Sequence, residues 1–163
     1  MKFSHRLRHP ALLACLAAAS ASFAQAPRYT VTTVVYSGDV ASNAVLDTRT
    51  GLTWRRCAEG QVWNGTTCTG SALTFTHEAA LTRAAAQTPA WRLPNVKELS
   101  SIADKALQNP AIDSTAFPAA PSNYFWSASP YVGNPSGAWV VSFGDGGVYG
   151  NGRSTSHLVR LVR

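Results

Sequence analysis

The nine residues WRLPNVKEL at 91–99 constrain the fold of this chain more than any other stretch. Trp91 and the leucine two residues later alternate as in a short strand with one face toward a core. Pro94 ends such a strand because it has no N–H to donate to a ladder. Asn95 and Glu98 then have the spacing of a helix capping box. The stretch therefore predicts a buried strand that changes directly into a helix.

Two helices are expected in the middle of the chain. Strong helix formers fill 76–86, where Thr76 can cap the N-terminus and His77 is expected to be solvated in the first turn. The second helix begins after Asn95 and is expected to run to about Leu107. A proline closely follows each segment, which favours an end there.

Strands are expected on both sides of these helices, where β-branched and aromatic residues gather. The segments 45–47 and 52–56 flank a Gly-containing turn, which indicates a hairpin. One side of this hairpin is expected to carry Leu46, Leu52 and Trp54, and the other Asp47 and Thr53. Further strands are expected at 29–36, 124–129, 138–143 and 157–162, with turns at 144–147 and 151–152. These elements predict one α+β domain with a loop-rich, β-rich C-terminal half.

The first 24 residues have the pattern of a secretory signal peptide. The basic residues Lys2, Arg6 and Arg8 precede an apolar run at 11–19 that is too short to span a bilayer. Small residues favour cleavage after about Ala24, which leaves 25–43 as an N-terminal strand segment. A lipoprotein anchor at Cys15 is the alternative. We therefore expect a periplasmic or secreted protein without a transmembrane segment.

Removal of the signal peptide would lower the net charge. The whole chain has 14 basic and 8 acidic residues, which gives a formal charge of +6. Residues 1–24 hold three of the basic residues and none of the acidic ones, so the remaining charge is 11 − 8 = +3. A charge this small weakens any argument for a nucleic-acid partner, and we expect none.

Two cysteines remain once Cys15 leaves with the signal peptide. Cys57 and Cys68 form an even pair in an oxidising compartment, which favours a disulfide. The alternative is a metal or redox pair, but the sequence offers no CxxC spacing, third cysteine or nearby histidine to support it. The loop that they close contains Trp63, for which the sequence indicates neither a core nor a surface position. The others, Trp54, Trp91, Trp126 and Trp139, are expected in the core.

Short motifs for catalysis are absent from the sequence. It contains no closely spaced pair of carboxylates, no GxSxG, no HExxH and no phosphate-binding glycine loop. The histidines that remain after signal removal, His77 and His157, have no free thiolate to partner them. A calcium site would need several carboxylates, yet Asp145 stands without a neighbouring Asp or Glu. We expect neither an enzyme nor a bound metal or other cofactor.

The C-terminal loops have the composition of a binding surface. Tyr, Ser, Asn and Gly dominate the non-core positions from Ser127 to His157, and this mixture is typical of antibody paratopes. The alternative is that these are ordinary solvated loops with good turn chemistry. Arg160 and Arg163 are expected to pair with carboxylates or the chain end rather than with a ligand. The expected ligand contacts are Tyr131, Asn134, Asp145, Tyr149, Asn151, Arg153, Ser154 and His157.

Five stretches in order resemble the Lcl C-terminal domain family, named for a collagen-like bacterial surface adhesin. They are VLDTRTGLTW at 45–54, CAEGQVW at 57–63 with Cys68, WRLPNVKEL, YFWSAS at 124–129, and VRLVR at 159–163. The resemblance covers 44–163 and implies a C-type-lectin-like fold, with two helices packed on small twisted antiparallel sheets and a ligand surface on the C-terminal loops. It implies no established enzyme activity. The founding adhesin binds sulfated glycosaminoglycans, and some related domains are variable proteins of diversity-generating retroelements.

The sequence thus predicts a secreted or cell-envelope domain, adhesin- or lectin-like, that binds a glycan or a protein through its C-terminal loops without catalysis. The chain lacks a collagen-like Gly-X-Y stalk, so trimerisation by that route is not implied, and the oligomeric state stays open. One alternative is a structural or assembly subunit of a pilus, fibre or envelope complex. An exported hydrolase is the less favoured alternative.

Overall fold

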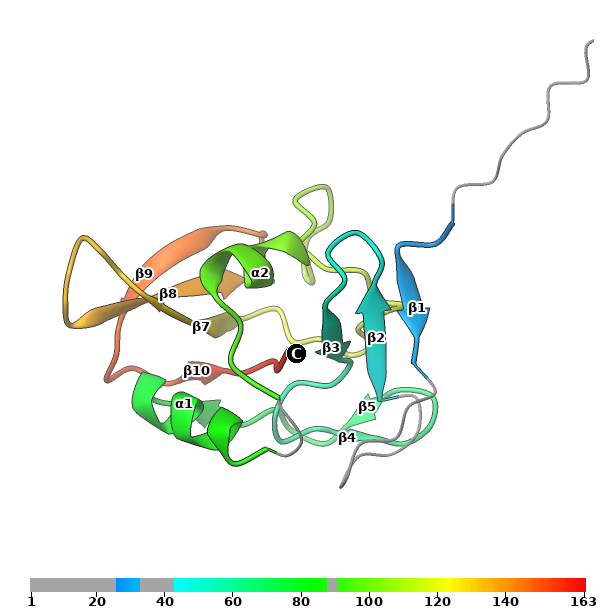
Figure 1. Cartoon of the computed structure of the whole chain (residues 1–163), viewed down its shortest axis with the longest axis horizontal. Helices are drawn as coiled ribbons and strands as arrows, with labels where there is room; N and C mark the ends of the chain where they lie inside the picture. The colour runs from blue at the N-terminus through cyan, green and yellow to red at the C-terminus, as the bar shows by residue number, and fades with distance from the viewer. Residues whose placement is uncertain (1–25, 33–42, 88–90) are drawn as a thin grey trace, which may run out of the picture.

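The computed structural model describes residues 26–32, 43–87 and 91–163. The expected signal peptide and the second half of the expected strand at 29–36 lie outside these residues. The fold is α+β, with two helices and three small sheets (Figure 1). A three-stranded sheet has the order β1 (Tyr29–Val31), β2 (Ala44–Asp47), β3 (Thr53–Arg55), and a two-stranded sheet joins β4 (Val62–Trp63) to β5 (Cys68–Thr69).

The largest sheet has five strands in the order β6 (Thr74–Phe75), β10 (His157–Leu158), β7 (Tyr124–Pro130), β8 (Gly137–Ser142), β9 (Val148–Gly152). The last strand of the chain is inserted between β6 and β7 and runs parallel to β7. The other strand pairs in this sheet are antiparallel. The expected strands at 124–129 and 138–143 are confirmed, whereas 151–152 belongs to the end of β9 instead of forming a turn.

Helices α1 (His77–Ala85) and α2 (Val96–Ser101) pack on opposite faces of the five-stranded sheet (Figure 1). Side chains alternate along a strand, and the two buried clusters divide accordingly. Trp126 and Val140 share a cluster with Ala80 of α1, and we call their side of the sheet the α1 face. Phe125 and Val141 share the other cluster with Leu99 of α2, which defines the α2 face.

The stretch at 91–99 contains the predicted capping box and helix, but in place of the predicted strand residues 91–93 form only a single β-bridge. Trp91 and Leu93 are buried, and Arg92 between them forms an isolated β-bridge with Val162. The capping box is present, because Asn95 Oδ1 accepts from the Glu98 N–H at 2.9 Å and Glu98 Oε2 accepts from the Asn95 N–H at 2.8 Å. The same carboxylate accepts two hydrogen bonds of 2.7 Å from the Arg92 guanidinium. Arg92 therefore links the start of α2, through Glu98, to the C-terminal segment, through Val162.

Two element ends differ from the predictions. Helix α2 ends at Ser101 instead of continuing to Leu107, because the chain turns so that Ala103 can form a β-bridge with Ile112. The expected strand at 157–162 is regular only over β10, and Val162 then bridges to both Trp54 and Arg92. In both places long-range pairing has replaced the continuation that the local sequence favours.

The β2–β3 hairpin is confirmed, but its predicted sides are wrong. The register pairs Val45 with Trp54 and Leu46 with Thr53, so Leu46 lies on the side opposite Trp54. Asp47 is fully buried, and its carboxylate accepts hydrogen bonds of 3.1 and 2.8 Å from Arg28. Burial raises the pKa of this carboxyl, but the hydrogen bonds from Arg28 and from the Arg49 N–H outweigh it and lower the pKa overall. The ion pair fastens the start of β1 to the hairpin.

Arg160 is fully buried and does not pair with a carboxylate as expected. Its Nη1 donates to the carbonyl oxygen of Arg55 at 2.8 Å and also to that of Arg56. The guanidinium lies 4.8 Å from the ring centre of Phe117 and 5.6 Å from that of Phe125. Burial lowers its pKa to about 9, so the group stays cationic at neutral pH. Carbonyl dipoles and aromatic faces thus take the place of a counter-ion.

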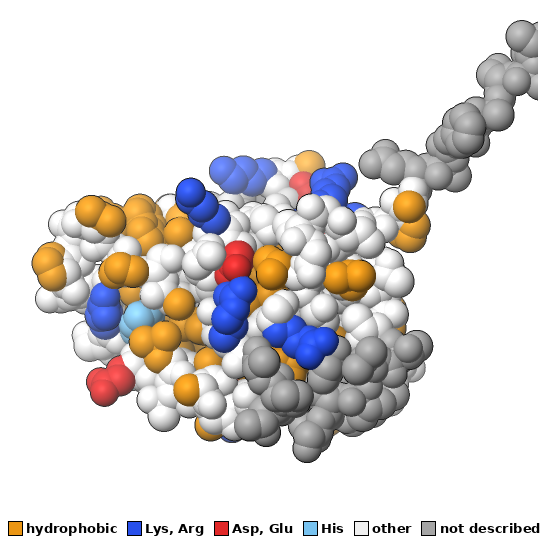
Figure 2. Space-filling view, in the orientation of Figure 1, with side chains coloured by type: hydrophobic (Ala, Val, Ile, Leu, Met, Phe, Trp, Pro, Cys, Tyr) orange, Lys and Arg blue, Asp and Glu red, His pale blue; other side chains and the backbone are white. Residues whose placement is uncertain are grey.

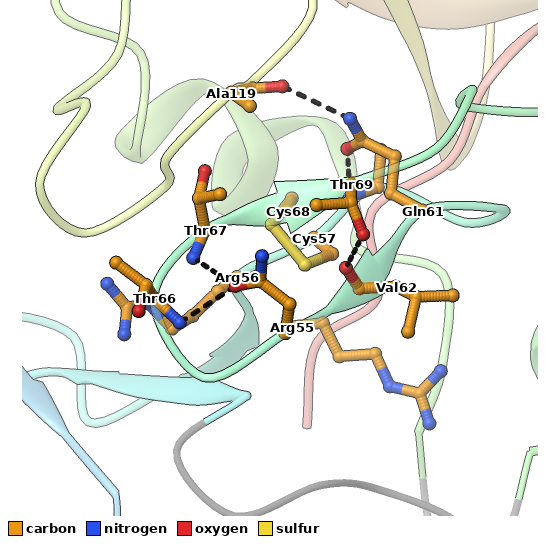
Figure 3. Close-up of a disulfide and its surroundings, with 12 residues drawn as sticks. Arg55, Arg56, Cys57, Gln61, Val62, Thr66, Thr67, Cys68, Thr69 and Ala119 are labelled. Carbon is orange, nitrogen blue, oxygen red and sulfur yellow. Dashed lines mark hydrogen bonds between the residues drawn. A yellow bond between two sulfur atoms is a disulfide. The ribbon is translucent and has the colours of Figure 1, made fainter.

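The Cys57–Cys68 disulfide is confirmed and closes a loop on the surface of the domain (Figure 3). The two cysteines form a separate buried cluster with Trp63, over whose ring the Arg56 guanidinium lies at 4.1 Å. Glu59, which is also buried, accepts hydrogen bonds from Arg55 at 3.0 Å and from Arg83 of α1 at 2.7 Å. The stapled loop is therefore anchored to α1 as well as to β3.

Candidate ligand-binding surface

Three side chains of the α1 face form a row of rings that α1 does not cover. We call Tyr149, Tyr124 and His157, from β9, β7 and β10, the aromatic row. The ring centres of Tyr149 and Tyr124 are 5.7 Å apart and those of Tyr124 and His157 are 5.6 Å apart, both with edge-to-face geometry. Tyr124 is 37% exposed, Tyr149 is 41% exposed and His157 is partly exposed. The row therefore offers solvent an aromatic surface on a sheet.

Buried Trp126 supports the row from one end. It lies two residues beyond Tyr124 on β7 and therefore shares its face of the sheet. The ring centre of Trp126 lies 4.7 Å from that of His157 and 5.1 Å from that of His77. Its indole Nε1 donates to the carbonyl oxygen of Phe75 at 2.8 Å. These contacts fix the ring of Trp126, which in turn fixes the orientation of His157.

Tyr149 is held from the other end by the β8–β9 turn. Its hydroxyl donates to Asp145 Oδ2 at 2.7 Å, and Asp145 Oδ1 accepts from the Gly147 N–H at 2.9 Å. A Cβ built on Gly147 would lie only 2.5 Å from atoms of the Tyr149 side chain, so only glycine lets the ring lie this close to the turn. The hydrogen bonds from Gly147 and Tyr149 lower the pKa of Asp145 to about 2, which keeps this carboxylate ionised.

The tautomer of His157 follows from its neighbour Thr155. The Thr155 hydroxyl donates its one hydrogen to the carbonyl oxygen of Gly152 at 2.6 Å. The hydroxyl oxygen can therefore only accept from His157 Nε2, which lies 3.1 Å away, and Nε2 carries the proton. Burial lowers the pKa of the imidazole below its usual value, so the ring is neutral at pH 7.

Tyr131 lies on the other face of the sheet from the row. Its ring centre is 4.6 Å from that of Trp139, which is half-buried and not part of the core as expected. A Cβ on Gly150 would lie 2.6 Å from the Tyr131 ring, and one on Gly137 would lie 3.2 Å from it. Hydrophobic side chains gather over the end of the molecule that carries β7, β8 and β9 (Figure 2). The expected contacts are thus divided between two surfaces.

Four more expected ligand contacts lie outside the aromatic row: Asn134, Asn151, Arg153 and Ser154. The side chains of two of them form hydrogen bonds with the backbone. Asn134 Oδ1 accepts from the Ser136 N–H at 2.9 Å and so shapes the β7–β8 loop. Asn151 is half-buried in β9 opposite Ala138. Arg153 Nε donates to the carbonyl oxygen of Gly137 at 3.0 Å. Arg153 and Ser154 line a surface pocket together with Thr76, His77, Glu78 and Leu81 from the start of α1.

Tyr124 is the one residue of the row that is not among the contacts expected from the sequence, where it belongs only to an aromatic strand. The sequence does contain a signal for it. Side chains alternate along a strand, so Tyr124 lies on the same face as Trp126, two residues away. Tyr124 begins the strand, and the first position of a strand is more easily left uncovered by the packed helix. The sequence could not show where α1 stops covering the sheet.

His77 is buried, with an exposed fraction of 2%, so the prediction of a solvated side chain is wrong. Its Nε2 donates to the carbonyl oxygen of Ser127 at 3.0 Å, which joins the start of α1 to β7. Burial lowers the pKa of its imidazole, and the positive charge of Arg153 adds to this effect, whereas the bond to Ser127 opposes it. The side chain is a structural contact of α1.

We expect the protein to lose stability as the pH falls below about 6.5. Folding lowers the pKa of both His77 and His157, so below this pH the unfolded chain binds more protons than the folded one. The loss cannot exceed about 1.4 kcal/mol per pH unit for each imidazole. Urea unfolding between pH 8 and 5 measures the free energy of unfolding. The ion-paired carboxyls Asp47 and Glu98 stay ionised over this range, because their pKa values are lowered. The His77→Gln and His157→Gln variants should each show a shallower slope, and an unchanged slope in both would contradict the assignment.

Within the described residues, no three or more His, Cys, Asp or Glu side chains gather into a group that could hold a metal ion. Across the same part of the chain, no helix has the length and apolar character needed to cross a membrane.

The fold and the surface together define a small, disulfide-stapled α+β domain with two helices on opposite faces of a five-stranded sheet. The sequence model of the Lcl C-terminal domain family matches residues 43–163, and the chain belongs to this family. Membership makes it an adhesin-related domain. Neither the search of curated proteins nor that of solved structures gave a significant match.

Proposed function

We propose that this protein is an exported recognition domain with a C-type-lectin-like fold that binds a glycan or protein ligand without catalysis. The proposal rests chiefly on the aromatic row, in which two tyrosines are more than a third exposed although their rings are held in fixed positions. Aromatic rings that need no ordering on binding lose little conformational entropy, so more of their contact energy appears as affinity. Residues 44–163 form the domain, and the ligand contacts come from its C-terminal strands and turns.

The absence of catalysis is part of this proposal, and the structural roles of the titratable groups support it. Both imidazoles use Nε2 in hydrogen bonds, His77 with Ser127 and His157 with Thr155. The ring of Trp126 contacts both histidines. Asp47, Glu59 and Glu98 are each bonded to arginine side chains. These groups are engaged in holding the fold together.

Export is supported by the disulfide, since such bonds persist mainly in oxidising compartments. We propose a periplasmic or secreted location, with the signal peptide at residues 1–24 removed. A lipid anchor at Cys15 remains the alternative route.

The binding proposal predicts separate effects on affinity and stability. The Tyr149→Ala variant should bind its ligand at least about tenfold more weakly, equivalent to about 1.4 kcal/mol, because it removes an exposed ring that carries few core contacts. Its melting temperature should change little for the same reason. Glycan and host-protein arrays identify the ligand, and titration calorimetry then gives the affinity.

The matched control is Tyr131→Ala, which removes a tyrosine from the opposite face of the same sheet. Its affinity should match that of the wild type. Equal losses of affinity in the two variants, or a loss in Tyr149→Ala that parallels its thermal destabilisation, would contradict the placement of the site.

A further inference from the structure

The aromatic row also has a chemical character that selects among ligands. Tyr124 and Tyr149 are 37% and 41% exposed as whole residues, and His157 continues the row as a neutral imidazole. Aromatic faces are apolar, whereas the groups at the edges of these rings can form hydrogen bonds. A pyranose has the complementary arrangement, because C–H groups cover one or both faces of its ring and hydroxyl groups project around it.

Asp145 gives the row a hydrogen-bond acceptor at one end. Its side chain is exposed, and it uses one oxygen for the Gly147 N–H and the other for the Tyr149 hydroxyl. An ionised carboxylate offers about four acceptor positions, so further capacity remains for a donor that arrives from solvent. A sugar hydroxyl placed over Tyr149 would supply such a donor.

The same carboxylate disfavours anionic ligands. A sulfate or carboxylate group over Tyr149 would lie near the negative charge of Asp145, and like charges brought together across an interface cost binding energy. Lys105 is a cationic residue beside this turn, and its Cγ would lie 3.0 Å from a Cβ built on Gly146. A sulfated ligand would need a nearby cation such as Lys105 to offset this repulsion, whereas an uncharged sugar would not.

We infer that the aromatic row is a stacking platform for an uncharged pyranose in a glycan, with Asp145 accepting a hydrogen bond from a hydroxyl of that sugar. This inference rests on the proposed binding function and narrows it to one ligand class. A protein partner fits the row less well, because each side of a typical protein complex buries about 800 Å² and the row consists of three side chains. Gly147 belongs to the platform indirectly, because it lets the Tyr149 ring lie against the turn.

The test measures binding of the purified protein to immobilised uncharged oligosaccharides: chitotetraose, cellotetraose, mannotetraose and a galactose-terminated tetrasaccharide. Heparin and a host-protein array serve as the competing ligand classes. The variants are Tyr124→Ala, Tyr149→Ala, Asp145→Asn and Gly147→Ala in the row, with Tyr131→Ala and Lys105→Ala as controls. Circular dichroism melting curves verify that each variant is folded, and Tyr149→Phe provides a milder change that keeps the ring.

We expect at least one uncharged oligosaccharide to bind, with little change in affinity between 50 and 500 mM salt. Tyr124→Ala and Tyr149→Ala should weaken this binding about tenfold or more, Asp145→Asn and Gly147→Ala severalfold, and both controls by less than twofold. Binding by Tyr149→Phe should lie between that of the wild type and that of Tyr149→Ala. Loss of binding in Asp145→Asn alone, with the tyrosine variants unaffected, would overturn the stacking platform.

Other outcomes separate this inference from the proposed function. If heparin binds in a salt-sensitive manner and Lys105→Ala abolishes it, the uncharged-sugar inference is wrong. If a host protein is the ligand and Tyr149→Ala weakens its binding, the inference is wrong as well, although the binding function stands. If neither the arrays nor the oligosaccharides give binding that depends on the row, both fail.

Discussion

Replacing Trp126 with alanine is expected to lower the free energy of unfolding by about 3–5 kcal/mol, the range typical of a large buried aromatic side chain. Trp126 is fully buried in the cluster that joins α1 to the sheet. The substitution removes that contact area and leaves a cavity between α1 and β7. It also leaves the carbonyl oxygen of Phe75 without its indole donor. Equilibrium unfolding in urea at pH 7.5, monitored by far-UV circular dichroism, measures the loss.

A matched variant, Trp126→Phe, separates the packing contribution from the hydrogen bond. Phenylalanine keeps an aromatic ring in the cluster, so this variant should lose only about 1–3 kcal/mol, the cost of an unsatisfied buried acceptor and a smaller cavity. A Trp126→Ala variant as stable as Trp126→Phe would show that the ring does not carry the packing that the structure assigns to it.

The local patterns of the sequence predicted most elements of the fold. The capping box at Asn95, the N-cap at Thr76 and the aromatic strand at 124–129 are determined by neighbouring residues, and the structure contains all three. The disulfide followed from the count of cysteines after export. Each of these features depends on residues that lie close together in the chain or on a simple count.

The features that were predicted wrongly depend on contacts between distant segments. The β2–β3 hairpin has the register that buries Asp47, and the distant Arg28 supplies the charged partner that helps to make that burial favourable. His77 is buried because its Nε2 reaches the carbonyl oxygen of Ser127, fifty residues away. Arg160 finds two carbonyl groups more than a hundred residues earlier in the chain. Sequence periodicity contains no information about partners at these separations.

For the candidate surface too, local sequence predicted some features, and others depend on contacts between distant segments. The composition of the C-terminal loops indicated the correct region, and Tyr149 and His157 do lie side by side with Tyr124 between them. The composition could not assign Tyr131 to the opposite face, because that depends on the register of β8 and β9 and on the irregularity in β7. Sheet register therefore decides which tyrosines can act together.

Removing the disulfide with the double variant Cys57→Ser, Cys68→Ser is expected to lower the free energy of unfolding by about 3 kcal/mol. The two cysteines are 11 residues apart, and closing a loop of this size restricts the unfolded chain by about that amount in the chain-entropy model. The melting temperature should fall by roughly 10 °C for a domain of this size. Differential scanning calorimetry measures both quantities, and a wild-type sample treated with dithiothreitol should reproduce them.

The same variant should bind ligand with unchanged affinity at a temperature where it remains folded. Cys57, Cys68 and Trp63 form a buried cluster separate from the two that hold the sheet and helices, so opening the bond leaves the supports of the aromatic row in place. The loop also stays anchored through Glu59 to Arg83 of α1 and through Gln61 to the carbonyl oxygen of Ala119. The double cysteine variant should therefore lose stability and keep its affinity, whereas Tyr149→Ala should lose affinity and keep its stability. A variant that melts normally but no longer binds would place the ligand contacts on the stapled loop instead of on the row.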